Sequence, residues 1–204
     1  MANPTGTKEV HDAMRAGKLG YIMTPRQGQL LFDGVTWCAD NSCFSKGYPG
    51  DDKWLAWLDR FSYAVDRCLF ATAPDVVGDA AATLKRSRPF LPMIRELGYP
   101  AALVAQDGLE ELDIPWDEFD ALFIGGSTDW KLGSAATALA MEAKSRGKHI
   151  HCGRVNSRRR LKFCAAVGYD SVDGTYLTFG PTVNLPKLLR WLDEINAEPT
   201  LFMT

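Results

Sequence analysis

The sequence predicts an α/β fold built on a parallel sheet, and we interpret it as a compact (β/α) barrel of the TIM type. Short apolar runs bounded by Gly, Pro or Asp recur along the chain, as expected of buried parallel strands. Amphipathic helical stretches alternate with these runs. No Gly-rich dinucleotide-binding loop follows the first run, which lowers the case for a doubly wound sheet. The 204 residues suit one domain, and no linker or repeat divides them.

The predicted strands are apolar on both faces, which indicates burial on both sides of the sheet. They are residues 19–24, 35–39, 67–71, 101–105, 121–125, 149–153 and 171–173. Residues 29–32 are the candidate for an eighth strand.

The first predicted helix, residues 53–64, places Trp54, Trp57 and Phe61 at helical spacing, so these aromatic side chains face the core. In the helical stretch 80–97, Pro89 and Pro92 predict a break or a kink. Three further helices are predicted at residues 134–146, 157–167 and 185–195. Ser157 and Gly168 have the residue types that cap the start and the end of the fourth helix.

Composition narrows the class of protein. The net charge of −2 argues against a surface that wraps nucleic acid nonspecifically, and no apolar run reaches the ~20 residues of a membrane span. We therefore expect a cytoplasmic protein. The cysteines are odd in number, scattered and without zinc-ligand spacing: Cys38, Cys43, Cys68, Cys152 and Cys164. Neither a metal nor another cofactor is expected.

Active sites of such barrels lie at the carboxyl ends of the strands. The polar or small residues that follow the predicted strands are Asp40, Asp75, Asp79, Gln106, Asp107, Gly125, Gly126, Arg154, Asn156 and Asp173. Any single Asp could be a turn or a helix cap. Carboxylates after three separate strands favour one active site.

A basic cluster, which we define as Arg154, Arg158, Arg159, Arg160 and Lys162, begins beyond one strand end. It is either a solvated helix face or a site for phosphate groups.

Five segments carry a resemblance to a known family: residues 37–42, 75–79, 103–106, 123–126 and 168–173. In this order and spacing the chain resembles the tRNA-guanine transglycosylase superfamily. More narrowly, it resembles the shortened phage and bacterial relatives that place 7-deazaguanine bases in DNA. The resemblance spans about residues 21–176.

The resemblance implies a barrel that exchanges guanine through a covalent glycosyl-enzyme intermediate. It implies that Asp173 is the nucleophile, Asp40 the general acid/base and Asp79 the carboxylate that reads the base. Gln106, Gly125 and Gly126 would complete the base pocket: Gln106 would donate toward O6, and the glycine backbone N–H groups would approach the base. Asp75 would support the pocket.

Some alternatives stay open. Asp170 could be the nucleophile instead of Asp173, Asp79 could cap the helix that starts at residue 80, and Gly125-Gly126 could be a plain turn.

The chain departs from the tRNA enzymes in three places. It has no Cys-rich zinc segment, Asn41-Ser42 replaces a Gly-Gly pair, and Gly174-Thr175-Tyr176 replaces an Arg-bearing segment. We therefore expect DNA and a 7-deazaguanine base as substrates, with Arg154, Arg158, Arg159 and Lys162 contacting phosphates. A homodimer is possible. The rival functions are a tRNA or nucleoside base exchanger, a small barrel lyase or isomerase, and a non-enzymatic nucleic-acid-binding subunit.

Overall fold

The computed structural model describes residues 1–3, 6–27 and 31–197. Its sheet has seven parallel strands whose spatial order follows the sequence. They are β1 (Tyr21–Met23), β2 (Trp37–Ala39), β3 (Cys68–Thr72), β4 (Ala101–Ala105), β5 (Ala121–Ile124), β6 (His149–Cys152) and β7 (Ser171–Val172). Each of the seven strands overlaps one of the predicted strand ranges. The predicted α/β fold, a shortened TIM-type barrel, is therefore confirmed.

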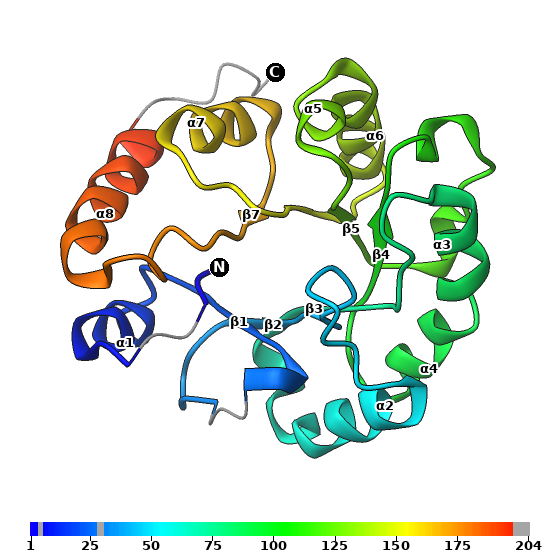
Figure 1. Ribbon diagram of the computed structural model, residues 1–204, viewed down its shortest axis with the longest axis horizontal. Helices are drawn as coiled ribbons and strands as arrows, with labels where there is room; N and C mark the ends of the chain where they lie inside the picture. The colour runs from blue at the N-terminus through cyan, green and yellow to red at the C-terminus, as the bar shows by residue number, and fades with distance from the viewer. Residues whose placement is uncertain (4–5, 28–30, 198–204) are drawn as a thin grey trace.

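The sheet curls into a ring with the helices outside it (Figure 1). The gap between β7 and β1 is bridged by one residue, Ala2, which pairs in parallel with Tyr21 on one side and Gly174 on the other. Ala2 donates its N–H to the Gly20 carbonyl oxygen (2.8 Å). The first residues of the chain thus lie where a full barrel has its eighth strand. Of the candidate eighth strand, residues 29 and 30 lie outside the described residues, and Leu31 and Phe32 form no strand.

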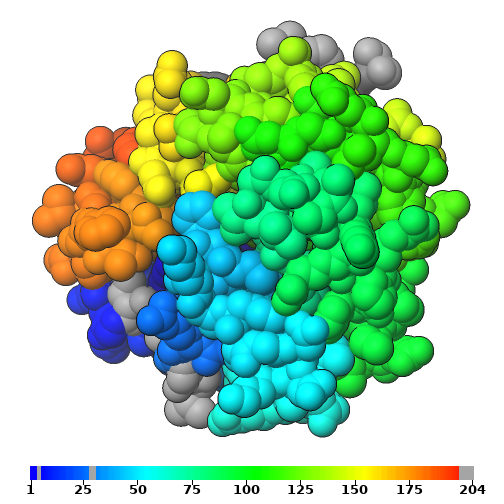
Figure 2. Space-filling model, turned by 45° about the vertical axis from the view of Figure 1, so that its right-hand side comes forward, coloured from blue at the N-terminus to red at the C-terminus, as the bar shows by residue number. Residues whose placement is uncertain are grey.

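The helices are α1 (Lys8–Arg15), α2 (Asp51–Arg60), α3 (Ala80–Ser87), α4 (Phe90–Glu96), α5 (Thr128–Lys131), α6 (Ser134–Ser145), α7 (Arg158–Val167) and α8 (Pro181–Ala197). The prolines separate α3 from α4 as predicted, because Pro89 lies between them. The sequence analysis missed α1 and α5. In the view of Figure 2, α2, α3 and α4 form a closely packed outer surface.

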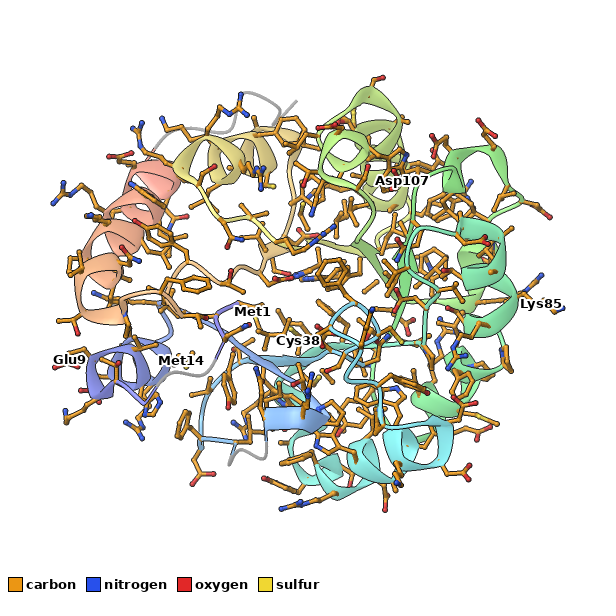
Figure 3. All side chains as sticks on the ribbon, in the orientation of Figure 1. Met1, Glu9, Met14, Cys38, Lys85 and Asp107 are labelled. Atoms are coloured by element: carbon orange, nitrogen blue, oxygen red, sulfur yellow. The ribbon has the colours of Figure 1, made fainter. Side chains whose placement is uncertain are left out.

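Two apolar layers hold the ring together. The larger layer lies between the strands and the helices and includes Trp37, Trp54 and Leu58. The smaller layer fills the inside of the ring with Ile22, Cys38, Phe70, Ala102 and Ala121, against which Met1 packs. Figure 3 shows Met1 and Cys38 inside the ring, whereas Glu9 and Lys85 point outward. Side chains alternate in direction along a strand, so every second residue of a strand reaches the interior.

No helix in the described part of the chain is long and apolar enough to cross a membrane.

Candidate active site

A small cavity of about 90 Å³ lies at the carboxyl ends of the strands. Its lining comes from the last residues of β3, β4 and β5 and from the segments that follow β2 to β7: Asp40, Asn41, Phe44, Thr72, Asp75, Val77, Val104, Gln106, Phe123, Gly125, Gly126, Gly153, Arg154 and Asp173. From the sequence, five residues are expected to converge on one pocket: Asp40, Asp79, Gln106, Gly126 and Asp173. Four of them, Asp40, Gln106, Gly126 and Asp173, line this cavity. Asp79 does not.

The two carboxyl groups of Asp40 and Asp173 have pKa values that are pushed in opposite directions. Burial raises the pKa of Asp40 to about 7, against a hydrogen bond from the Ser42 N–H (2.9 Å), and the negative charges of Asp173 and Asp75 add to the rise. Burial acts most strongly on Asp173 and would raise its pKa, but His151, the Arg154 N–H and the α-amino group of Met1 together outweigh burial and leave that pKa below its usual value. Near neutral pH, Asp173 is therefore ionised while a large fraction of Asp40 is protonated.

Asp173 is held by two neighbours. His151 Nε2 donates to its Oδ2 (3.0 Å), and the backbone N–H of Arg154 donates to its Oδ1 (3.2 Å). Asp170 precedes β7 and lies at the amino end of the strands. There its carboxylate accepts from the Ile150 N–H (2.8 Å) and pairs with Lys144 (3.0 Å). Only Asp173 of these two candidates lines the cavity.

The third carboxyl group in the cavity belongs to Asp75, which is buried. Its Oδ1 accepts from Asn41 Nδ2 (3.1 Å) and its Oδ2 accepts from Gln106 Nε2 (2.9 Å). Burial raises the pKa of Asp75, and these two donors act against the rise. Gln106 Oε1 in turn accepts from the Gly78 N–H (3.1 Å). An amide NH₂ group carries two hydrogens, so Gln106 keeps one donor beyond its bond to Asp75.

Asp79 is placed differently from the expectation that it reads the base. Its side chain is exposed, precedes α3 and accepts from the Ala82 N–H (2.9 Å), which is the geometry of a helix N-cap. The capping alternative therefore describes its position.

The glycine pair shapes the cavity without offering donors to it. Both N–H groups, of Gly125 and Gly126, donate to the Ala105 carbonyl oxygen (3.0 and 3.1 Å), so the expectation that they approach a base is wrong. A Cβ at Gly126 would lie 2.3 Å from the Trp130 ring, and one at Gly125 would lie 2.9 Å from Val104. Glycine is needed here because the neighbouring side chains leave no room.

The basic cluster divides into Arg154, which is half-buried at the cavity, and four residues on α7. The Arg154 guanidinium points to the cavity wall, where it donates to the carbonyl oxygens of Gly125 (2.8 Å) and Gly126 and lies over the Phe44 ring. Arg158 pairs with Glu194 (2.6 Å), and Arg159 is exposed on α7. Arg160 and Lys162 are half-buried on the same helix. Arg154 therefore lies at the cavity wall, apart from the other three residues expected to contact phosphates, which are on α7.

The sequence analysis missed several polar residues around the site. His149, His151 and Ser171 form hydrogen bonds behind Asp173, and their signal was the alternation His-x-His and Ser-x-Asp on neighbouring strands. Lys131 is 1% exposed and donates to the Gly153 carbonyl oxygen (2.6 Å), which anchors the end of β6 from outside the ring. Burial lowers the pKa of Lys131 to about 8.

A larger cavity of about 400 Å³ lies between the gap in the sheet and the helices α7 and α8. Its walls are largely apolar, with Leu161, Leu188 and Trp191 among them, and it includes Asp173 but neither Asp40 nor Asp75. We place the chemistry in the smaller cavity, because three carboxyl groups, those of Asp40, Asp75 and Asp173, line it at the carboxyl ends of the strands. The larger cavity is lined by Asp170 and Asp173, which lie at opposite ends of β7. No cluster of metal-ligating side chains is found in residues 1–3, 6–27 and 31–197.

Comparisons with known proteins show the fold. No protein-family model and no curated protein matches the chain. Among solved structures, a mandelate oxidase variant carrying an FMN adduct aligns with a TM-score of 0.61 and 16% identity, covering 92% of this chain and 66% of that one. The BexX/CysO complex of Amycolatopsis orientalis aligns with a TM-score of 0.57 and 15% identity, covering 92% and 84%. Tryptophan synthase from M. tuberculosis aligns with a TM-score of 0.49 and 15% identity, covering 91% and 64%.

The alignment with mandelate oxidase shows that the chain has a TIM-barrel-like fold. The chain spans slightly less than two thirds of the length of the mandelate oxidase and tryptophan synthase chains.

Proposed function

We propose that the protein is a DNA-guanine transglycosylase, which exchanges guanine in DNA for a 7-deazaguanine base through a covalent bond to Asp173. The observation that carries the proposal is the pair Asp40 and Asp173, which line one cavity with pKa values shifted apart. Two carboxyl groups of opposite protonation state are the equipment for breaking and remaking a glycosidic bond.

In the first half of the reaction, an oxygen of Asp173 bonds to C1′ of the nucleotide while the bond from C1′ to the guanine nitrogen breaks. The bonding electron pair leaves with guanine, and the proton of Asp40 neutralises the departing base. An ionised Asp173 also stabilises the positive charge that develops on the sugar in the transition state.

In the second half, the 7-deazaguanine enters the same cavity and gives its ring N–H proton to Asp40. Its nitrogen then bonds to C1′, and the bond from C1′ to Asp173 breaks. Both carboxyl groups return to their starting protonation states, so the cycle needs no cofactor.

We assign the reading of the base to Asp75 in place of Asp79. The N1–H and 2-amino groups of guanine present two donors side by side, which one carboxylate can accept. Asp75 lines the cavity and is oriented by Asn41 and Gln106, and the second amide hydrogen of Gln106 can donate to O6. Deazaguanines share this edge, so one cavity can serve both bases.

The size of the cavity favours a base as the group that enters it. At about 90 Å³ it is smaller than the roughly 300–1,000 Å³ pockets of drug-sized ligands. A flat base fits this space better than a whole nucleotide does, with the sugar left at the mouth. The target base must then leave a duplex or come from a single strand.

DNA is the proposed polymer because the zinc segment and the Arg-bearing segment of the tRNA enzymes have no counterpart in the sequence. The exposed face of α7, which carries Arg159, remains for phosphate contacts.

The test is nucleoside mass spectrometry of DNA and tRNA incubated together with the protein and cyano- or aminomethyl-substituted 7-deazaguanine. We expect the deazaguanine nucleoside to accumulate in DNA with the wild-type protein and not with Asp173→Asn, since an amide is a poor nucleophile. Asp170→Asn is the matched control and should retain activity. The deazaguanine nucleoside in tRNA alone would assign the same chemistry to tRNA instead of DNA. Its absence from both polymers would refute the proposal.

A further inference from the structure

Four polar side chains form a continuous chain of hydrogen bonds inside the ring of strands. His149 Nε2 lies 2.7 Å from Ser171 Oγ, which lies 2.8 Å from His151 Nδ1. His151 Nε2 lies 3.0 Å from Asp173 Oδ2. The first and third residues come from β6 and the others from β7 and its end, so the chain runs along two paired strands toward the cavity.

The acceptor at the end of this chain determines where the hydrogens lie. An ionised carboxylate can only accept, so His151 Nε2 must carry a hydrogen. In a neutral ring, Nδ1 is then an acceptor and takes the Ser171 hydroxyl hydrogen. The Ser171 oxygen is left to accept from His149 Nε2–H. Every donor in the chain therefore points toward Asp173.

His151 remains neutral in this position. Burial lowers its pKa to about 4, and the groups that act on it are Asp173, the α-amino group of Met1 and His149. Its side chain is 0% exposed and lies between the Phe70 and Phe123 rings, with centroids 5.0 and 4.6 Å away. His151 does not line the cavity, so no substrate touches it.

We propose that His151 is a positioning residue for Asp173, which it holds with one carboxylate oxygen turned to the barrel interior and the other free to attack. Ser171 and His149 select the ring tautomer that can donate. That Asp173 attacks the nucleotide rests on the proposed function. That His151 positions the Asp173 carboxylate rests on the hydrogen-bond geometry alone.

The geometry also distinguishes the two oxygens of Asp173. Oδ2 accepts the 3.0 Å bond from His151, while within the described part of the chain Oδ1 accepts one longer bond, of 3.2 Å, from the Arg154 N–H at the cavity edge. Oδ1 is therefore the atom that bonds to C1′ as the bond to the base breaks. His151 keeps its hydrogen throughout and adds no proton to the balance.

The first test compares His151→Phe, which fills the space without a donor, with His151→Gln, whose amide can donate to Asp173. For His151→Phe we expect kcat of base exchange to fall about 10–100-fold with KM for the base nearly unchanged, as for other residues that orient a reacting group. The acidic limb of the pH–rate profile should move to higher pH, because Asp173 loses the donor that lowers its pKa. His151→Gln should restore much of the rate and should return the acidic limb of the pH–rate profile toward its wild-type pH.

His11→Phe, on α1, is the matched control and should leave both rate and profile unchanged. Should His151→Phe fail to fold, Ser171→Ala leaves the His151 imidazole in place but removes the hydrogen bond that fixes its tautomer. For Ser171→Ala we expect a smaller shift of the acidic limb in the same direction.

A second measurement does not depend on activity. Carboxyl ¹³C NMR of Asp173 in the protein without substrate should show its pKa rising in His151→Phe and returning in His151→Gln. An unchanged Asp173 titration in His151→Phe would refute the positioning role even if base exchange is real. A wild-type protein that exchanges no base, but whose Asp173 titration responds as expected, would refute the proposed function alone.

Discussion

Asp75 and Gln106 are joined by a hydrogen bond of 2.9 Å between the carboxylate Oδ2 and the amide Nε2. The bond joins the segment after β3 to the segment after β4, and the Gly78 N–H holds the other end of the amide. A carboxylate with its donors already arranged loses little freedom when a ligand binds to its remaining lone pairs. This pair is the basis of our first prediction.

Asp75→Ala should weaken binding of guanine by about 2–3 kcal/mol, since it removes a charge-assisted acceptor. It should also reduce the preference for guanine over hypoxanthine, which lacks the 2-amino group. Isothermal titration of both bases measures the effect, with Asp79→Ala as the control that leaves selectivity unchanged. If selectivity is lost in Asp79→Ala and kept in Asp75→Ala, the roles must be exchanged.

Asp79→Ala should destabilise the fold by about 1 kcal/mol, the usual cost of removing an N-cap. The reason is that the Ala82 N–H loses its acceptor at the start of α3. Urea unfolding gives the free energy, and Asp79→Asn, which keeps a capping oxygen, should recover most of it. Full stability together with lost base exchange in Asp79→Ala would contradict the capping role.

Stability should depend on pH through Asp40. Its folded pKa of about 7 lies above the ordinary value of 3.8, so between these pH values the folded state binds a proton that the unfolded state has lost. The contribution of Asp40 to the free energy of unfolding, at most about 4 kcal/mol, is therefore fully present below about pH 4 and is lost as the pH rises through 7. Asp40→Asn cannot titrate, and its unfolding free energy should fall less between pH 5 and pH 8 than that of the wild type. Parallel curves for the two proteins would show that Asp40 titrates normally.

Arg159→Glu should weaken binding to DNA by a similar factor for every sequence. An exposed arginine that contacts a phosphate contributes about one counterion, so the slope of log affinity against log salt should decrease by about 1. Fluorescence anisotropy at several salt concentrations measures both quantities. Lys85→Glu, on the outward side of α3 (Figure 3), is the matched charge reversal and should change binding little. Equal losses in the two variants would mean that only the net charge matters.

The strands β1 to β5 were predictable because each is an apolar run between turn residues, and the order of all seven strands along the chain is their order in the sheet. Helices with a long apolar stripe or a clear cap were predictable for the same reason. The short α5, with four residues, carries too few turns for a periodic pattern.

The site was less predictable, because strand ends locate a residue only to within a turn. Asp75 and Asp79 both follow β3, and their separate positions depend on how the intervening turn directs each side chain. A sequence also cannot show which N–H groups are already bonded, so Gly125 and Gly126 resembled open donors while both were committed to Ala105. The histidines behind Asp173 became meaningful only when β6 and β7 paired in register.

The bridge made by Ala2 has a consequence for how the molecule opens. Two paired positions join β6 to β7, whereas four join β4 to β5 and four join β5 to β6, and across the last gap a single residue joins the two edges. Local opening starts where the fewest hydrogen bonds must break, so the strands should separate first at the junction of β7 and β1. Backbone amides of β1 and β7 would then exchange with deuterated water before those of β4 and β5. Asp173 lies beside the junction that Ala2 bridges, whereas Asp75 follows β3, which is paired with a full strand on each side. The two halves of the site would therefore come apart before the fold as a whole is lost.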